Sequence, residues 1–182
     1  MSRLYYSYAR SSLCNVYIFW FRNKKGIKIA RVFLSKNRYG MRREIRKLFP
    51  AATRKNNSVA SNISAYFEGK PASFDFKKLN NILFSKFQRI VYHKVRKIPY
   101  GKVMTYGTLA SNLAVRSPMA VGNALAKNPF PIIIPCHRIV SSDRKLCGFQ
   151  AGVKLKKALL KSEGITFDKK DRIPEKFFVT VG

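Results

Sequence analysis

The sequence predicts an α+β fold in two parts, a mixed amino-terminal part and a mainly helical carboxy-terminal part. Two patterns support this prediction. Runs of β-branched and aromatic residues separated by a turn stand near the start of the chain, whereas apolar residues recur with helical spacing from Ser85 onward. With 182 residues and 46% hydrophobic content, the chain is long and apolar enough for one or two domains with a buried core.

The amino-terminal part is expected to contain a β-hairpin and two helices. Cys14–Phe21 and Ile27–Leu34 carry strand-forming residues, and Asn23–Gly26 between them has the composition of a turn. Helical spacing follows at Arg42–Phe49 and at Ser58–Phe67.

The segment 70–81 is mixed and polar apart from two phenylalanines, so we expect it to link the two parts. This places a domain boundary between residues 76 and 77. The expected domains are therefore residues 1–76 and residues 77–182.

Three helices are expected in the next part of the chain. The first begins near Ser85, and its apolar side is formed by Phe87, Ile90, Val91, Val95 and Ile98. The other two run from Thr105 to Leu113 and from Ser117 to about Lys127, with a short connection between them. This is the outline of a helix-turn-helix, although two short helices with a tight connection are also common as plain core packing.

The chain is strongly basic, because 37 Lys and Arg residues oppose 8 Asp and Glu residues and give a formal net charge of +29. So large a surplus, spread through both halves, indicates a polyanionic partner. Nucleic acid is favoured over a membrane, since no stretch reaches the roughly 18 apolar residues of a transmembrane helix. The alternative is a general basicity shared by the proteins of a Lys-rich proteome.

The cysteines and the amino terminus indicate a compartment. Cys14, Cys136 and Cys147 form an odd set without the paired spacing of a zinc site, so we expect neither a disulfide framework nor a metal. Residues 1–12 are polar and lack the apolar core of a signal peptide. Together these features predict a cytoplasmic protein in a reducing environment.

The motif that most suggests chemistry is Pro135-Cys136-His137-Arg138, which follows an apolar run. A thiol becomes a good nucleophile when its proton is removed, and an imidazole paired with a carboxylate can remove it. Neighbouring side chains need a turn to meet, however, and a buried cysteine often serves packing alone. Cys136 is therefore a candidate nucleophile, with a structural role as the alternative.

The second helix of the helix-turn-helix outline is rich in small residues. We expect Ala120, Gly122, Ala124 and Ala126 to leave a smooth face that lets the backbone approach another surface closely. A helix that reads the major groove would carry longer polar side chains, so the minor groove or the DNA backbone fits better. Packing against a neighbouring helix is the alternative.

Several motifs occur in the order of one family. They are Ile98–Val103, Thr105–Ala110, Ala120–Ala124, Asn128-Pro129, Ile134–Val140 and Leu159–Gly164. In these motifs the chain resembles the O6-alkylguanine-DNA alkyltransferases, closely in its carboxy-terminal half and more loosely in its amino-terminal half. The resemblance implies a ribonuclease-H-like α/β domain without catalytic residues. It also implies a mainly helical, winged helix-turn-helix-like domain for DNA binding and alkyl transfer.

The resemblance assigns catalytic roles to five residues. Cys136 matches the cysteine that accepts the alkyl group, and His137 the histidine that removes its proton through a bound water. Glu163 matches the carboxylate that orients this histidine. Asn128 matches the residue that braces the active-site turn, and Tyr106 the tyrosine that contacts the target nucleotide and donates to the base.

The other expected site residues contact DNA or line the substrate pocket. The DNA contacts are Arg116, Met119, Ala120, Gly122, Lys127 and Arg138. The pocket residues are Tyr106, Pro135, Gly148, Phe149 and Gln150. Met119 stands where the family usually has an arginine that enters the base stack, and a long apolar side chain can still act as a wedge. Cys147, in the loop after the motif, is interpreted as incidental.

These assignments predict a monomeric, single-turnover DNA repair protein. It would bind duplex DNA in the minor groove, take a flipped O6-alkylguanine into a pocket, and transfer the alkyl group irreversibly to Cys136. O4-alkylthymine is a further candidate substrate. No cofactor, metal or membrane is expected. The alternatives are a non-catalytic DNA-damage-binding protein and a thiol hydrolase that uses Cys136 and His137.

Overall fold

The computed structural model describes residues 3–70, 72–80, 82 and 84–179. The chain separates into two compact units, residues 1–81 and 82–182, called unit 1 and unit 2 below. Both helices and strands are present, which confirms the α+β class in this coarse form.

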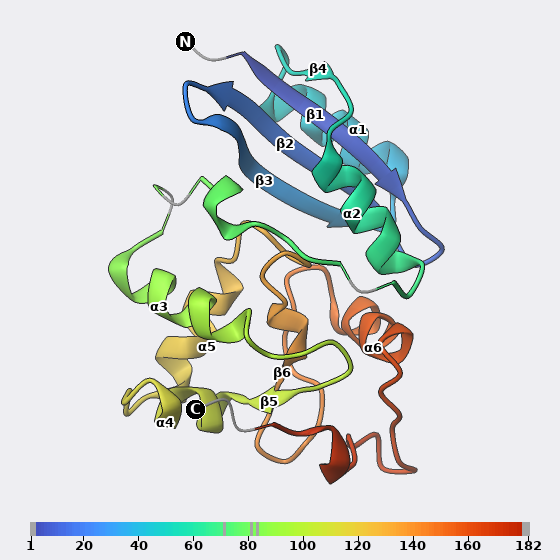
Figure 1. Cartoon of the computed structure of the whole chain (residues 1–182). Coiled ribbons are helices and arrows are strands. Elements are labelled where there is room, and N and C mark those ends of the chain that lie inside the picture. The colour runs from blue at the N-terminus through green and yellow to red at the C-terminus, as the bar shows by residue number, and fades with distance from the viewer. Residues whose placement is uncertain (1–2, 71, 81, 83, 180–182) are drawn as a thin grey trace. The chain divides into compact units, whose positions relative to one another are not determined.

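Unit 1 is built on a four-stranded sheet (Figure 1). Its strands are β1 (Leu4–Arg10), β2 (Asn15–Asn23), β3 (Gly26–Ser35) and β4 (Thr53–Arg54), in the order β3-β2-β1-β4. β2 and β3 form the predicted hairpin, and Gly26 at its turn has a φ of 101°, which favours glycine. β1 pairs antiparallel with β2 and parallel with β4.

The strand β1 has no counterpart among the predicted elements, because its sequence is largely polar. The structure explains it through Ser7, which is fully buried. The Ser7 hydroxyl donates to the carbonyl oxygen of Lys55 and accepts a hydrogen bond from the Trp20 indole. Because both partners are provided, a polar residue can lie in the core at little cost.

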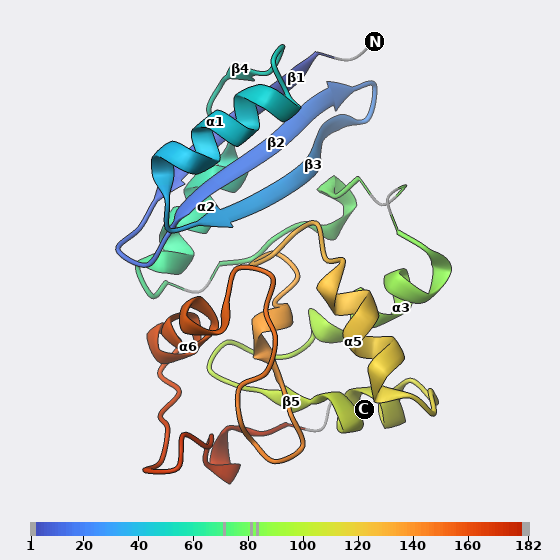
Figure 2. The ribbon, with the colours of Figure 1, turned by 180° about the vertical axis from the view of Figure 1, so that it is seen from behind.

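Two helices cover opposite faces of this sheet (Figures 1 and 2). α1 (Arg38–Leu48) packs Ile45 against Phe19 of β2, and α2 (Ser58–Phe67) has the predicted bounds. α1 begins earlier than predicted because the Asn37 side chain caps it, accepting a hydrogen bond from a backbone N–H of the first turn.

The segment predicted as a linker belongs to unit 1. A short 3₁₀ helix, η1 (Phe76–Lys78), is followed by Leu79, which is buried and pairs with Ile29 of β3. The division after residue 81 therefore lies later than the expected boundary after residue 76. The prediction failed because the segment is mostly polar in composition, whereas its one buried leucine, Leu79, attaches it to the sheet. Pro71 and Asn81 of this segment lie outside the described residues.

Unit 2 is mainly helical. Its α-helices are α3 (Lys86–Val95), α4 (Tyr106–Asn112), α5 (Pro118–Ala126) and α6 (Val153–Ser162). Thr105 and Ser117 cap α4 and α5 as predicted. The strands β5 (Met104–Thr105) and β6 (Ile139–Val140) form a short parallel pair. In the described part of the chain, no helix has both the length and the apolar character needed to cross a membrane.

The buried side of α3 matches the prediction at Val91 and Val95, and at Ile98 just beyond its end, but not at Ile90. Val91, Tyr92 and Val95 are buried, whereas Ile90 is 56% exposed. The Tyr92 hydroxyl donates to the carbonyl oxygen of Ala124, which joins α3 to α5. Because a tyrosine can bury its ring and satisfy its hydroxyl, Tyr92 turns the buried face away from Ile90.

Candidate active site

The Pro-Cys-His-Arg motif forms a 3₁₀ turn, η3 (Cys136–Arg138), that leads directly into β6. Residues 131–140 are all buried. The turn sends consecutive side chains in different directions, so that Cys136 borders a cavity while His137 and Arg138 reach Glu163 at the end of α6.

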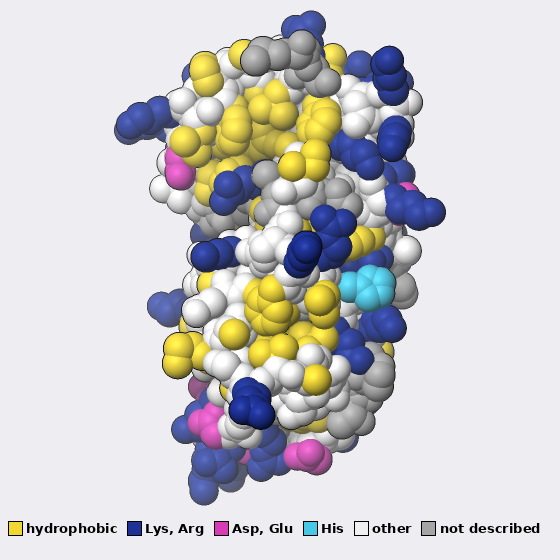
Figure 3. All heavy atoms as spheres, turned by 90° about the vertical axis from the view of Figure 1, so that its left-hand side faces the viewer, with side chains coloured by type: hydrophobic (Ala, Val, Ile, Leu, Met, Phe, Trp, Pro, Cys, Tyr) yellow, Lys and Arg dark blue, Asp and Glu magenta, His cyan; other side chains and the backbone are white. Residues whose placement is uncertain are grey.

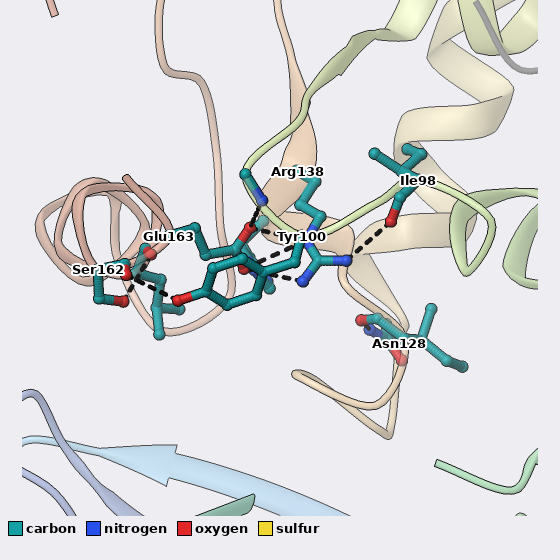
Figure 4. A network of polar contacts seen from close by, with 10 residues as sticks. Ile98, Tyr100, Asn128, Arg138, Ser162 and Glu163 are labelled. Carbon is teal, nitrogen blue, oxygen red and sulfur yellow. Dashed lines mark hydrogen bonds and ion pairs between the residues drawn. The ribbon is translucent and has the colours of Figure 1, made fainter. Parts of the chain in front are cut away.

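Glu163 is the centre of a buried polar network (Figure 4). Its Oε1 lies 2.8 Å from His137 Nε2. The Arg138 guanidinium donates to Oε2 at 2.9 Å and to Oε1 at 3.0 Å, and its third donor reaches the carbonyl oxygen of Ile98 at 2.8 Å. The backbone N–H of Gly101 also donates to Oε2, at 3.1 Å. Both oxygen atoms of the Glu163 carboxylate therefore accept hydrogen bonds.

The surroundings of Glu163 and His137 determine which of the two side chains is charged. Burial by itself would raise the pKa of Glu163, but His137 and then Arg138 outweigh burial and lower the pKa to about 2. Burial lowers the pKa of His137, although Glu163 acts in the opposite direction. At neutral pH an ionised carboxylate thus accepts a hydrogen bond from a neutral imidazole. With Nε2 as the donor, Nδ1 is the ring nitrogen that can take up a proton.

The thiol of Cys136 is held by Asn128. The Asn128 side-chain amide donates to Cys136 Sγ at 3.1 Å and to the carbonyl oxygen of Ile134 at 2.9 Å, and its oxygen accepts from the backbone N–H of Phe130 at 2.9 Å. Burial raises the pKa of Cys136, while the Asn128 hydrogen bond and the charge of Lys156 act to lower it. The net direction is upward, so the thiol needs a base before it can react.

Cys147, interpreted from the sequence as incidental, lies beside a buried lysine of α6. Lys156 of α6 is fully buried, and its ammonium donates to the carbonyl oxygens of Ile139 and Cys147 and lies 3.9 Å from Cys147 Sγ. Burial and then the neighbouring Cys147 raise the pKa of the Tyr106 phenol. Burial lowers the pKa of Lys156. The sequence signal for this network was a lysine on the buried side of α6, next to Leu155.

A cavity of about 300 Å³ opens beside Cys136. Its lining residues are Tyr106, Gly122, Leu125, Ala126, Cys136, Gly148, Phe149 and Gln150. Four of the five expected pocket residues are among them, whereas Pro135 is buried at the start of the turn and is absent from the lining. Leu125 and Ala126 were missed, because nothing in their local sequence distinguishes them from core residues. Among the described residues, no cluster of His, Cys, Asp and Glu is arranged to hold a metal ion.

The residues expected to contact DNA divide into two groups. Arg116, Met119 and Lys127 are exposed around α5, and Met119 is 74% exposed. Arg138, in contrast, is buried with its guanidinium on Glu163, so the expectation of a DNA contact there is wrong. A buried carboxylate neutralises this arginine and keeps it from the surface.

The small residues of α5 do not share one face. Ala124 is buried and its carbonyl oxygen accepts from α3, Ala120 is half-buried, and Gly122 lines the cavity. Residues two apart on a helix point in nearly opposite directions, which explains why the expected smooth face is split. The outward side of α5 instead carries Met119, with Asn123 one turn further on.

Comparisons with known proteins identify similar sequences and structures. Residues 86–165 match the family profile described as 6-O-methylguanine DNA methyltransferase, DNA binding domain. A methylated-DNA–protein-cysteine methyltransferase of Saccharolobus solfataricus is 45% identical over 113 residues, which are 62% of this chain and 68% of that protein. The O6-methylguanine methyltransferase of Mycobacterium tuberculosis has a TM-score of 0.69 at 26% identity, covering 94% of this chain and 96% of its own. A structure titled as Mycobacterium tuberculosis OGT in complex with DNA has a TM-score of 0.68 at 26% identity, covering 87% and 92%.

Proposed function

Because the chain belongs to the methylated-DNA–protein-cysteine methyltransferase family, we propose that it repairs DNA by transferring the alkyl group of O6-alkylguanine to the thiol of Cys136. O4-alkylthymine in DNA is proposed as a second substrate. The observation that carries this proposal is the position of Cys136 at a cavity of about 300 Å³, next in sequence to the buried His137 that bonds to Glu163.

The protonation states of Cys136, His137 and Glu163 indicate how the alkyl group is transferred. The thiol proton passes to His137 through a water, as in the family, and Glu163 stabilises the imidazolium that forms. The thiolate sulfur attacks the alkyl carbon, the bond from this carbon to O6 breaks, and its electron pair stays on the guanine. Tyr106 donates a hydrogen bond to the base and offsets this charge until the guanine anion takes up one proton, which balances the proton that left the thiol. The product is an S-alkylcysteine and an intact guanine, and a thioether is not hydrolysed, so each protein acts once.

Duplex DNA is the proposed partner of unit 2, bound through its minor groove. Arg116 and Lys127 would contact phosphates, while Ala120 lies on the helix that approaches the groove. Met119 would enter the base stack when the alkylated base is flipped into the cavity. Gly122, which lines the cavity, would face the flipped base rather than the groove.

The finer description of the fold is part of the same proposal. In unit 1, the strand order β3-β2-β1-β4 with β4 parallel to β1 supports a ribonuclease-H-like domain, proposed from the sequence for residues 1–76. In unit 2, the capped α4 and α5 beside the short β5–β6 pair support a winged helix-turn-helix-like domain for DNA binding and alkyl transfer, proposed for residues 77–182. We also propose that the protein acts as a monomer in the cytoplasm.

Intact-protein mass spectrometry tests the function directly. After incubation with duplex DNA that contains O6-methylguanine, each protein should gain one methyl group, on Cys136, and then stop. Cys136→Ala should gain none, whereas Cys14→Ala, a matched control at another buried cysteine, should gain one. Continued turnover would indicate a thiol hydrolase, and binding of damaged DNA without any transfer would indicate a non-catalytic binder.

A further inference from the structure

About half of the basic charge lies in unit 1, which contains none of the active-site residues. Residues 1–81 hold 18 Lys and Arg residues against 3 Asp and Glu residues. Figure 3 shows basic side chains over both units on the face in view, with few acidic ones among them. Repulsion among like charges destabilises a compact unit, so a surplus of this size is favourable mainly where an anion binds.

Part of this charge converges on one small cavity of unit 1. The cavity has a volume of about 40 Å³ and is lined by Tyr6, Tyr8, Tyr17, Arg42 and Arg54. Arg42 comes from α1 and Arg54 from β4, so two separate elements bring their guanidinium groups to the same place. Within the described residues, neither arginine takes part in an ion pair.

The chemistry of the lining suits a phosphate group. Two guanidinium groups at one cavity repel each other, and an anion between them reverses the sign of that interaction. The planar fork of arginine matches the oxygen atoms of a phosphate and can donate two hydrogen bonds at once. The ring of Tyr17 packs 5.0 Å from that of Tyr8 and 6.5 Å from that of Tyr6, which gives the cavity a rigid wall.

The wall is also fixed in orientation. The Tyr8 hydroxyl donates to Asn15 Oδ1 at 2.5 Å, and Tyr17 is buried. Glu44, the acidic residue of α1, is exposed and is not part of the lining. A preformed site with two positive charges and no carboxylate in its lining would hold an anion without rearrangement.

We propose that this cavity, here called the Tyr–Arg site, binds a phosphate of the nucleic-acid backbone, so that unit 1 makes its own contact with DNA. The inference rests on the proposed function only in taking DNA as the partner. The cavity is small, about 40 Å³, so the proposed ligand is a single phosphate group whose remainder stays outside. The surrounding surface of α1 is also basic, since Arg43, Arg46 and Lys47 are exposed.

The test compares two double variants of the full chain that lose the same charge. Arg42→Gln/Arg54→Gln removes the Tyr–Arg site, while Arg22→Gln/Arg31→Gln removes two exposed arginines of unit 1 that neither line it nor belong to α1. Fluorescence anisotropy with an undamaged duplex gives the affinity across a range of salt concentrations. The site variant should bind roughly tenfold more weakly at low salt, and its log-log salt slope should be shallower by about 0.9, one phosphate contact. The control should keep the parental slope.

Two results would overturn the proposal. An equal loss of duplex affinity in both double variants would mean that the arginines of unit 1 act only through their long-range electrostatic field and not through a phosphate contact. The second result concerns inorganic phosphate, tested as a stabiliser in thermal unfolding against chloride at equal ionic strength. If phosphate stabilises the parent but the site variant binds duplex normally, the site takes free anions rather than DNA.

The proposed function is tested separately in the same samples. Both double variants should still methylate Cys136 by mass spectrometry, because every residue of the transfer chemistry lies in unit 2. If the parent transfers no methyl group, the proposed function fails, while the duplex-binding comparison still decides whether the Tyr–Arg site contacts DNA.

Discussion

His137 Nε2 lies 2.8 Å from Glu163 Oε1, and both side chains are completely buried. The same carboxylate receives two charge-assisted hydrogen bonds from Arg138, so one acidic group serves an imidazole and a guanidinium at once. We therefore expect a substitution at Glu163 to affect both the proposed transfer chemistry and the stability of the fold.

Glu163→Gln should slow methyl transfer by about a hundredfold, because a neutral amide cannot stabilise the imidazolium that forms when His137 takes up a proton. Affinity for duplex DNA should change little. Single-turnover rates with methylated duplex, measured beside anisotropy, give both values. Glu175→Gln, at an exposed carboxylate of unit 2 paired with Arg144, is the control and should react at the parental rate. An unchanged rate for Glu163→Gln across neutral pH would remove Glu163 from the mechanism.

Glu163 should also make the stability of the fold depend on pH. Its pKa in the folded protein is about 2, below the ordinary 4.5, so the ionised carboxylate stabilises the fold above pH 4.5. This contribution is lost as the pH falls from 4.5 toward 2. Thermal unfolding should give Glu163→Gln a lower Tm than the parent at pH 7, with a gap that narrows at pH 3. A gap of constant size would contradict this account.

Tyr106→Phe should slow transfer about tenfold to a hundredfold while leaving duplex affinity nearly intact. Burial raises the pKa of Tyr106 above its ordinary value of 10, and the neighbouring Cys147 acts in the same direction, so the phenol keeps its proton at neutral pH. Phenylalanine preserves the ring and removes this donor. Single-turnover kinetics would report the loss. Tyr39→Phe, at an 80% exposed tyrosine of unit 1, should be neutral. Equal rates for the parent and Tyr106→Phe would show that the base receives no hydrogen bond from this residue.

Met119→Ala should slow repair of duplex DNA strongly but leave reaction with free O6-benzylguanine nearly intact. Met119 is 74% exposed, so the change removes a wedge from the base stack and not a core contact. Met119→Arg should keep or improve duplex repair, because a guanidinium can fill the gap and donate to the unpaired base. The matched control is Ile90→Ala, at an exposed apolar residue of α3 in the same unit. If Met119→Ala repairs duplex DNA at the parental rate, another residue must enter the base stack, and Arg116 is the next candidate.

Local interactions explain what the sequence could predict. The hairpin, the bounds of α2 and the caps of α4 and α5 depend on residues within a few positions of one another, such as Thr105 and Ser117 with the N–H groups three residues on. The strand β1 and the extent of unit 1 could not be predicted in this way. They depend on Ser7 meeting Trp20 and on Leu79 meeting Ile29, and no local pattern marks such distant partners.

In the active site, too, some features depend on neighbouring residues and others on contacts between residues distant in sequence. The sequence by itself determined the order of the motifs and, through the family resemblance they carry, led to the proposal that the thiol of Cys136 and the imidazole of His137 are the reacting groups. Only the tertiary structure decided that Cys147 lies beside the buried Lys156, and that Arg138 is buried on Glu163 and not exposed at the surface. The physical reason is that burial and partners are set by side chains distant in sequence, and an arginine is drawn inward only where a buried carboxylate offsets its charge.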